Sequence, residues 1–344
     1  MRLLKYDPDG EFSLAEFFNE CDTPKYAILS HTWGAEEVTF KDLADGTGKN
    51  KTGYDKIRFC AQQAADDSLQ YFWVDTCCID KSSSAELQEA INSMFRWYRD
   101  AVKCYVYLSD ISLPPFDAAV DFTKAWELPF RESRWFTRGW TLQELIAPAS
   151  VEFYSKEGKL LGDKVSLEQL VCEITGIPIR AFQGSPLSDF GIPERMAWAK
   201  PRQTKREEDG VYSLLGIFDV HMPLIYGERR KNALKRLYEE IEKSSKDKDF
   251  RFVKLLSSTL PHRLIALIAT SATGLLAAKA PLSSISARQL ITWIATSATG
   301  LFVARAPLSS ISTHRLMAWI AISAAGLFAA RAPLSSISTH RLMA

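Results

Sequence analysis

The sequence predicts an open α/β fold, in which a parallel sheet carries helices on both faces. Within the first 160 residues, short apolar runs alternate with longer stretches of helical periodicity. Strands that alternate with helices in this way usually form a parallel sheet. The apolar runs also end in polar and aromatic residues. Because ligands bind beyond the carboxyl ends of such strands, those endings are the first candidates for a functional site.

The predicted elements follow one another in regular alternation. The predicted strands are residues 25–30, 71–75, 104–108 and 151–154, and the predicted helices are residues 53–65, 84–101 and 141–146. The helix at 84–101 has the most regular pattern: Ser83 and Glu86 match a capping box, and apolar residues recur three or four positions apart. Pro148 ends the helix at 141–146. Residues 160–245 are predicted to be mostly helical and to cover the same domain.

A change in composition near residue 250 marks a different part of the chain. The heptapeptide Ala-Pro-Leu-Ser-Ser-Ile-Ser begins at residues 280, 306 and 332, a tandem repeat of 26 residues. We divide the chain into an α/β core (1–160), a helical part (161–250) and a repeat tail (251–344). The tail is expected to be disordered or loosely helical. Its apolar stretches fall short of the roughly 20 residues that span a bilayer, so stacked helices, contact with a membrane surface and a tail without function all stay open.

Composition excludes several classes of function. Lysine plus arginine number 42 against 41 acidic residues, which gives no electrostatic footprint for nucleic acid. The six cysteines have no metal-binding spacing and predict free thiols in a reducing compartment, and no metal site is expected. The charged residues 1–7 do not form a secretory signal, so we expect a cytoplasmic protein. Residues 46–53 fail as a phosphate-binding loop, because Asn50 stands where serine or threonine is needed.

Candidate functional residues lie at the ends of two predicted strands. Ser30, His31, Trp33 and Gly34 follow the first strand, and Asp75 ends the second. A lone histidine in this position is more often a turn residue than a catalytic base. An aspartate there either caps the following turn or faces a ligand.

The segment 134–148 combines two tryptophans, a phenylalanine, two arginines and the carboxylate of Glu144. Such a segment is too aromatic for a surface loop and too charged for a core helix. Glu144 lies four residues after Trp140, so the two share a helix face. Glu144 is either catalytic or an exposed or ion-paired side chain behind a core tryptophan. We expect it to lie beside Ser30, His31 and Asp75.

Several of these segments together resemble the HET domain, the heterokaryon incompatibility domain of filamentous fungi. They are Tyr-Ala-Ile-Leu-Ser-His-Thr-Trp-Gly at 26–34, Trp-Val-Asp-Thr-Cys-Cys-Ile-Asp at 73–80, Glu-Ala-Ile-Asn-Ser-Met-Phe-Arg-Trp-Tyr at 89–98 and Gly-Trp-Thr-Leu-Gln-Glu at 139–144. With matches at 212–218 and 223–228, the resemblance covers about residues 1–245. Gly210 and Arg229 depart from it, since alanine and glycine are usual there.

The domain is similar to the one that vegetative incompatibility proteins place before a NACHT-type NTPase module and a β-propeller of WD repeats. Neither a Walker A motif nor WD repeats follow residue 250. HET domains are in turn similar to TIR domains, which share a flavodoxin-like sheet. Many TIR domains hydrolyse NAD with the glutamate of a Trp-Cys-x-x-Glu-Leu helix. Residues 140–145 have that spacing, with Thr141 in place of the cysteine.

This resemblance implies a site in which Glu144 is catalytic. The residues implied to bind the substrate are Ser30, His31, Trp33, Gly34, Asp75, Arg138 and Trp140. Trp33 or Trp140 would stack on a base, and the backbone of Gly34 or the side chain of Arg138 would meet phosphates. NAD would be the substrate, and no cofactor is expected.

The resemblance implies an effector of fungal non-self recognition, a form of innate immunity that ends in programmed cell death. If the chain is an enzyme, it is expected to be an NAD nucleosidase. Two alternatives are a non-enzymatic signalling module that acts by self-association and an inert truncated allele. The expected partners are further copies of the chain on activation and a signalling protein, with no nucleic acid.

Overall fold

The computed structural model describes residues 1–7, 11–113 and 126–259. The chain divides into two units, Met1–Glu242 and Lys243–Ala344. The first unit contains both the predicted α/β core and most of the predicted helical part. Nearly all of the predicted repeat tail lies outside the described residues, so the interpretations of the repeats stay predictions.

Seven strands form one mixed sheet in the order β2-β1-β4-β3-β5-β6-β7. The strands are β1 (Arg2–Tyr6), β2 (Phe12–Glu16), β3 (Tyr26–His31), β4 (Tyr71–Trp73), β5 (Lys103–Tyr107), β6 (Val151–Tyr154) and β7 (Leu160–Asp163). The four inner strands β4, β3, β5 and β6 are parallel, and Ile28 of β3 pairs with Trp73 and with Cys104. Strands β1, β2 and β7 are antiparallel to their neighbours.

The four strands predicted from the sequence are confirmed, but the prediction of a wholly parallel sheet was wrong. The three missed strands lie at the two edges of the sheet, where their residues are mostly half-buried or exposed. A parallel strand that is covered on both faces has a continuous apolar run, as β3 does with all six of its residues buried. The edge strands lack such a run, and their alternation of charged and apolar residues is weak.

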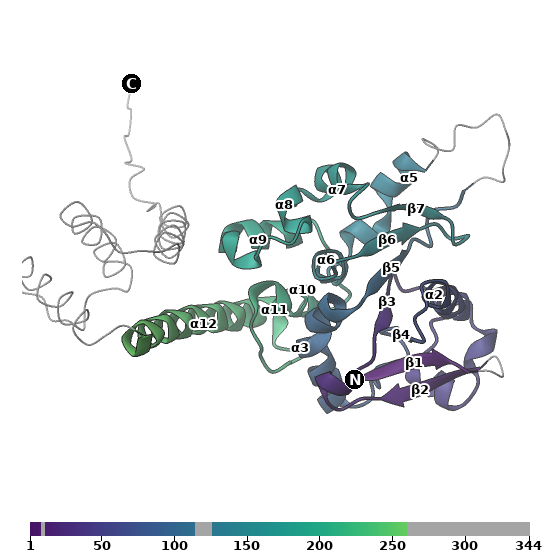
Figure 1. Cartoon of the computed structure of the whole chain (residues 1–344), viewed down its shortest axis with the longest axis horizontal. Helices are drawn as coiled ribbons and strands as arrows, with labels where there is room; N and C mark the ends of the chain where they lie inside the picture. The colour runs from purple at the N-terminus through teal and green to yellow at the C-terminus, as the bar shows by residue number, and fades with distance from the viewer. Residues whose placement is uncertain (8–10, 114–125, 260–344) are drawn as a thin grey trace, which may run out of the picture. The chain divides into compact units, whose positions relative to one another are not determined.

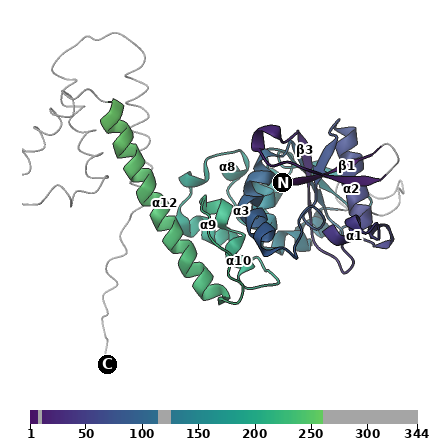
Figure 2. The ribbon, with the colours of Figure 1, turned by 90° about the horizontal axis from the view of Figure 1, so that it is seen from below.

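Helices cover both faces of the sheet, with α2 and α3 on opposite sides of β3 (Figures 1 and 2). The helices are α1 (Phe40–Ala44), α2 (Tyr54–Asp66), α3 (Ser84–Asp100), α5 (Glu127–Glu132), α6 (Thr141–Ile146), α7 (Glu168–Thr175), α8 (Ile179–Phe182), α9 (Ile192–Ala199), α10 (Asp209–Tyr212), α11 (Leu215–Phe218) and α12 (Arg229–Thr259). Within the described ranges, no helix is both long enough and apolar enough to cross a membrane.

Helix α3 shows how closely the sequence pattern determined the packing. Its buried residues are Ala90, Ile91, Met94 and Tyr98, which belong to the predicted apolar stripe. At its start, the Ser83 hydroxyl accepts a hydrogen bond from the backbone N–H of Glu86 at 3.3 Å. The Glu86 carboxylate accepts instead from the backbone N–H of Asp80 and pairs with Arg2. The predicted capping box is therefore only half formed, because Glu86 also anchors strand β1.

The helical part packs on α3 through a residue without a side chain. Within the region predicted to be mostly helical, residues 209–218 form the two short helices α10 and α11, and α11 lies against α3. A Cβ atom on Gly216 of α11 would lie 2.0 Å from the Cβ atom of Phe95 on α3. Non-bonded carbon atoms do not come so close, so glycine at 216 is what permits this approach of the two helices.

Arg229 occupies a backbone conformation that suits glycine. It begins α12 with a φ of +67°, in the left-handed region that side chains with a Cβ atom disfavour. Its backbone N–H donates to Glu208 Oε1 at 3.0 Å, which holds the turn in place. Position 229 is also where the resemblance to the HET domain implied glycine, so the departure noted in the sequence falls on a residue in the left-handed region.

Substituting Gly216 with alanine should destabilise the first unit. The added methyl group overlaps Phe95, and overpacking of this kind costs about 1–3 kcal/mol or more. Gly191→Ala is the matched control, because a Cβ atom there meets only Pro193 at 3.7 Å and the loss of a glycine N-cap costs less than about 1 kcal/mol. Urea unfolding of both variants measures the difference. Equal stability of the two would contradict the packing described for α3 and α11.

Substituting Arg229 with glycine should stabilise the protein by about 1 kcal/mol, because it relieves the left-handed conformation. Lys231→Gly, two residues further into α12, should instead cost about 1 kcal/mol, since glycine there only weakens the helix. The two free energies of unfolding, measured under the same conditions, should therefore change in opposite directions. A loss of stability in both variants would show that Arg229 is not strained in solution.

Candidate functional site

The Glu144 carboxyl group lies at the carboxyl end of β3, where it contacts Ser30. The Ser30 hydroxyl donates a hydrogen bond to Glu144 Oε2 at 2.5 Å. The same hydroxyl accepts from Trp135 Nε1 at 2.8 Å. All three residues are buried. The predicted neighbourhood of Glu144 and Ser30 is therefore present, with Trp135 as an added member.

Helix α6, which carries Glu144, is short but is held at both ends. All six of its residues are buried. At its start, the Thr141 hydroxyl donates to the carbonyl oxygen of Trp135 at 2.6 Å. At its end, Lys164 Nζ donates to the carbonyl oxygens of Ile146 at 3.2 Å and Pro148 at 2.8 Å. The bonds from Lys164 satisfy carbonyl groups that a buried helix end would otherwise leave unpaired. Burial lowers the pKa of Lys164 to about 8.

Burial makes Glu144 a weak acid. Glu144 is only 7% exposed. Desolvation raises the pKa of its carboxyl group to about 8, because the charged form loses contact with water. The hydrogen bond from Ser30 and the positive charge of Arg202 lower this pKa, while the negative charge of Asp75 raises it. At neutral pH most molecules therefore hold Glu144 as a neutral carboxylic acid.

His31 lies on the opposite face of β3 from Ser30, because successive residues of a strand alternate in direction. Its side chain is 1% exposed, and Nε2 lies 3.7 Å from both Glu37 Oε2 and Asp75 Oδ1. Neither ring nitrogen has a hydrogen-bond partner among the described residues. Burial lowers the pKa of His31, so the ring is neutral at pH 7. His31 therefore belongs to strand β3 and not to the turn that follows it, and its role in substrate binding stays a prediction.

Trp33 forms an exposed aromatic surface beside this histidine. It is 47% exposed, and its indole Nε1 donates to Asp75 Oδ2 at 2.9 Å. The Lys81 ammonium group lies 3.8 Å from the centre of the Trp33 ring and 3.5 Å from Asp75 Oδ2. Asp75 therefore fixes the indole ring, while Lys81 covers one of its faces.

The other three predicted site residues make different contacts. The backbone N–H of Gly34, predicted to meet phosphates, already donates to Glu37 Oε1 at 2.6 Å. Arg138 forms a backbone bridge with Gln203. Trp140 packs partly buried against the core, just before α6. The described hydrogen bonds of Arg138 are made by its backbone, to both the helical part and the segment around α6, whereas Ser30, His31, Trp33, Asp75 and Glu144 gather around the ends of β3 and β4.

The sequence analysis missed the cations around this site. Lys56 pairs with Glu37 and donates to the Thr32 carbonyl oxygen at 3.0 Å. Lys81 and Lys164 were not predicted either, and the charge of Arg202 was expected to pair with the α/β part without a named partner. Lys81 directly follows the segment at 73–80, which was a usable signal. Lys164 and Arg202 lie far from the other site residues in sequence, and no pattern linked them to Glu144. Among the described residues, no cluster of histidine, cysteine or acidic side chains could hold a metal ion.

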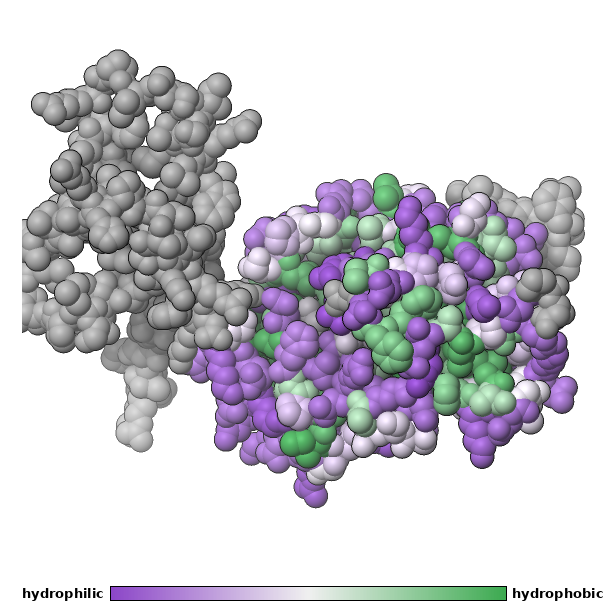
Figure 3. Space-filling model, turned by 60° about the horizontal axis from the view of Figure 1, so that its bottom comes forward, coloured by the Kyte–Doolittle hydropathy of each residue, from purple (hydrophilic) through white to green (hydrophobic). Residues whose placement is uncertain are grey.

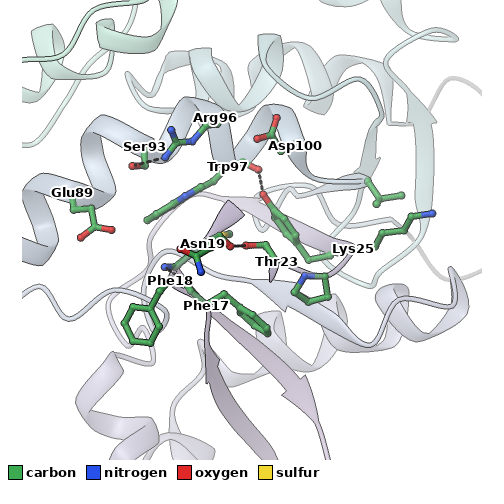
Figure 4. A pocket seen from close by; sticks show the side chains of 14 residues that line it. Phe17, Phe18, Asn19, Thr23, Lys25, Glu89, Ser93, Arg96, Trp97 and Asp100 are labelled. Carbon is green, nitrogen blue, oxygen red and sulfur yellow. Dashed lines mark hydrogen bonds between the residues drawn. The ribbon is translucent and has the colours of Figure 1, made fainter. Parts of the chain in front are cut away.

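A cavity of about 270 Å³ lies elsewhere, at the start of β3 (Figure 4). It is lined by aromatic and charged side chains, among them Phe17, Tyr26, Arg96 and Trp97. Phe18, which is 86% exposed, borders it. None of the predicted site residues lines this cavity.

On the face drawn in Figure 3, apolar patches interrupt a largely hydrophilic surface.

Comparison with known proteins identifies the family. Residues 26–114 match the family model described as heterokaryon incompatibility protein (HET). The chain is 60% identical over 245 residues to the vegetative incompatibility protein HET-E-1 of Podospora anserina. That match covers 71% of this chain but only 18% of the relative, so the chain spans less than a fifth of its length. No solved structure matches the chain.

The family model covers β3, β4, α3 and β5, the elements that place Ser30, His31, Trp33 and Asp75. The 60% identity of the longer match, to the Podospora protein, shows common descent. Both results agree with the motifs at 26–34 and 73–80. The chain therefore belongs to the heterokaryon incompatibility (HET) family.

Proposed function

We propose that this chain is a cytoplasmic effector of fungal vegetative incompatibility, which triggers cell death in non-self recognition by hydrolysing NAD. Membership of the HET family and the similarity to a vegetative incompatibility protein support the biological role. The relative is much longer than this chain, so its activity as a whole protein is carried over only as part of the proposal.

One observation supports the enzymatic part most strongly: a carboxyl group lies at the carboxyl ends of parallel strands. The four inner strands lie in the order β4-β3-β5-β6. If these four parallel strands are numbered by their order in the chain, the order across the sheet is 2-1-3-4. This is the order of flavodoxin-like sheets, in which ligands bind at the strand ends. It supports the TIR-like fold that the resemblance implies, and with it the catalytic role of Glu144.

The proposed chemistry is cleavage of the bond between nicotinamide and ribose. The departing nicotinamide takes the bonding electrons and leaves as a neutral molecule, so no general acid is required. The ribose carbon becomes an oxocarbenium-like cation, which the ionised Glu144 carboxylate would stabilise. Water then attacks that carbon and releases a proton. The exposed ring of Trp33 is suited to stack on a base.

A second candidate function is a non-enzymatic signalling module that acts by self-association. The observation that favours it is the burial of Glu144, whose carboxyl group is neutral and bonded to Ser30 in the described conformation. A catalytic role requires that the substrate, or contact with another copy or a signalling partner, gives access to this group. The scaffold function requires no such access.

Glu144→Gln in the full chain should reduce NAD cleavage by at least about 100-fold, because the amide cannot carry the charge that stabilises the ribose cation. Nicotinamide release, measured under conditions that favour assembly, is the readout. Glu168→Gln, at a half-buried glutamate of α7 that accepts a hydrogen bond from Gln183, is the matched control and should keep full activity.

Expression in fungal cells separates the alternatives. Toxicity that is lost with Glu144→Gln and kept with Glu168→Gln supports the enzyme. Toxicity that survives Glu144→Gln, together with an oligomeric protein that releases no nicotinamide, supports the scaffold. A folded protein that causes no growth defect and releases no nicotinamide would indicate an inert allele.

The wild-type protein should lose stability relative to Glu144→Gln as the pH rises from about 5 to 8. The pKa of Glu144 is raised in the folded state, so folding is favoured most where the carboxyl group is protonated in both states. That contribution is lost as the pH rises through the folded pKa of about 8. The slope of the difference is at most about 1.4 kcal/mol per pH unit. Urea unfolding at several pH values measures it, and parallel curves for the two proteins would contradict the burial of this carboxyl group.

A further inference from the structure

Arg202 is a buried guanidinium group in the helical part, and the mechanism above does not use it. It is 8% exposed. Its Nη1 atom donates to Thr141 Oγ1 at 2.8 Å and to the Arg138 carbonyl oxygen at 3.0 Å. Its Nη2 atom has no hydrogen-bond partner among the described residues. A buried cation that is incompletely bonded carries a free-energy cost, and its presence calls for an explanation.

The segment that carries Arg202 is joined to the start of α6. The backbone N–H of Gly139 donates to the Gln203 carbonyl oxygen at 2.9 Å, and the Gln203 N–H donates to the Thr137 carbonyl oxygen at 2.6 Å. A Cβ atom on Gly139 would lie 2.4 Å from Thr204 Cγ2. These contacts give the helical part a fixed attachment immediately before the helix that carries Glu144.

Arg202 and Glu144 are electrostatically coupled although no direct ion pair joins them in the described structure. The positive charge of Arg202 favours the ionised form of Glu144, and the negative charge of Glu144 in turn favours the charged form of Arg202. Both groups are buried, and in a medium of low dielectric constant such charges interact strongly over several ångströms. Ser30 and Tyr98 of α3 contribute hydrogen bonds that favour the ionised carboxylate but no charge. Asp75 opposes ionisation with its negative charge, and the buried thiol of Cys104 on β5 is uncharged.

We propose that Arg202 is a positioning residue of the Glu144 site, which holds the first turn of α6 in place and supplies the positive charge that the ionised carboxylate needs. It acts through Glu144 and is not expected to touch the substrate. Because Arg202 belongs to the helical part, a shift of residues 202–204 against the segment 137–141 would change how readily Glu144 ionises. The attachment thus links events on the helical part to the catalytic carboxyl group.

This inference rests on the proposed function only where it calls Glu144 catalytic, so its first test needs no activity. Infrared difference spectroscopy on the full chain follows the protonated carboxyl group of Glu144, identified as the band that Glu144→Gln lacks. Arg202→Gln should move the titration midpoint of this band upward by at least about half a pH unit, and Arg202→Lys, which keeps the charge, should move it less. A midpoint unchanged in a folded Arg202→Gln protein overturns the proposal.

The matched control is Arg195→Gln. Arg195 is a half-buried arginine of the same helical part, which donates to the Ile217 carbonyl oxygen at 2.9 Å and stacks on Phe218. Its loss should lower stability but leave the Glu144 titration unchanged. If Arg202→Gln does not fold, Thr141→Val serves instead, since it removes the hydroxyl that accepts from Arg202. A smaller upward shift is then expected, and no shift overturns the proposal.

Kinetics give an independent reading. If the full chain cleaves NAD, Arg202→Gln should shift the low-pH limb of the kcat profile upward by the same amount as the infrared midpoint and leave KM nearly unchanged. A uniform loss of kcat at all pH values would mean a structural role only, and would overturn the electrostatic part of the proposal. If no variant cleaves NAD, the enzymatic function fails, while the infrared titration still decides the role of Arg202.

Discussion

A carboxyl group removed from water must either stay neutral or be matched by hydrogen bonds and opposite charge. The Glu144 site balances these two conditions. The burial of Glu144 with the rest of α6 favours the neutral form of its carboxyl group. The hydrogen bond from Ser30 and the charge of Arg202 favour the ionised form, and burial has the larger effect. The pKa of about 8 that results lies close enough to neutrality for small movements around the group to change its charge. Much of the surrounding structure is arranged around this one group.

The two faces of β3 divide the site into a neutral side and a charged side. Ser30 faces the Trp135 and Glu144 side chains, where the hydrogen bonds are short and the residues are buried. His31 faces the carboxylates of Glu37 and Asp75, each of which has a lysine partner. The charged side leads outward to the exposed ring of Trp33. The exposed ring of Trp33 therefore lies on the charged side, whereas the carboxyl group of Glu144 is buried on the other side.

The helical part is attached to the α/β core at points that constrain the site. Gly216 of α11 fits against Phe95 of α3, and residues 202–204 bond to the segment that leads into α6. The other end of α6 is held by Lys164, the residue that directly follows β7. Two buried cations thus hold the two ends of a helix too short to be stable by itself. This explains why residues remote in sequence decide the position of Glu144.

The sequence alone determined the four parallel strands, the helices between them and the family, because buried strands and amphipathic helices leave strong apolar patterns. It also placed Glu144 beside Ser30, since α6 and the end of β3 meet at one edge of the sheet, whereas the expected position of Glu144 beside His31 does not follow, because His31 faces the other side of β3. The edge strands β1, β2 and β7 were not predicted, because half-exposed strands have weak hydrophobic patterns in the sequence. Only the tertiary structure decided that Glu144 is buried and neutral, that His31 has no hydrogen-bond partner in the part of the chain that the structure describes, and that Arg202 and Lys164 secure α6. Those properties depend on burial and on contacts between distant segments, and no local pattern in a sequence records either.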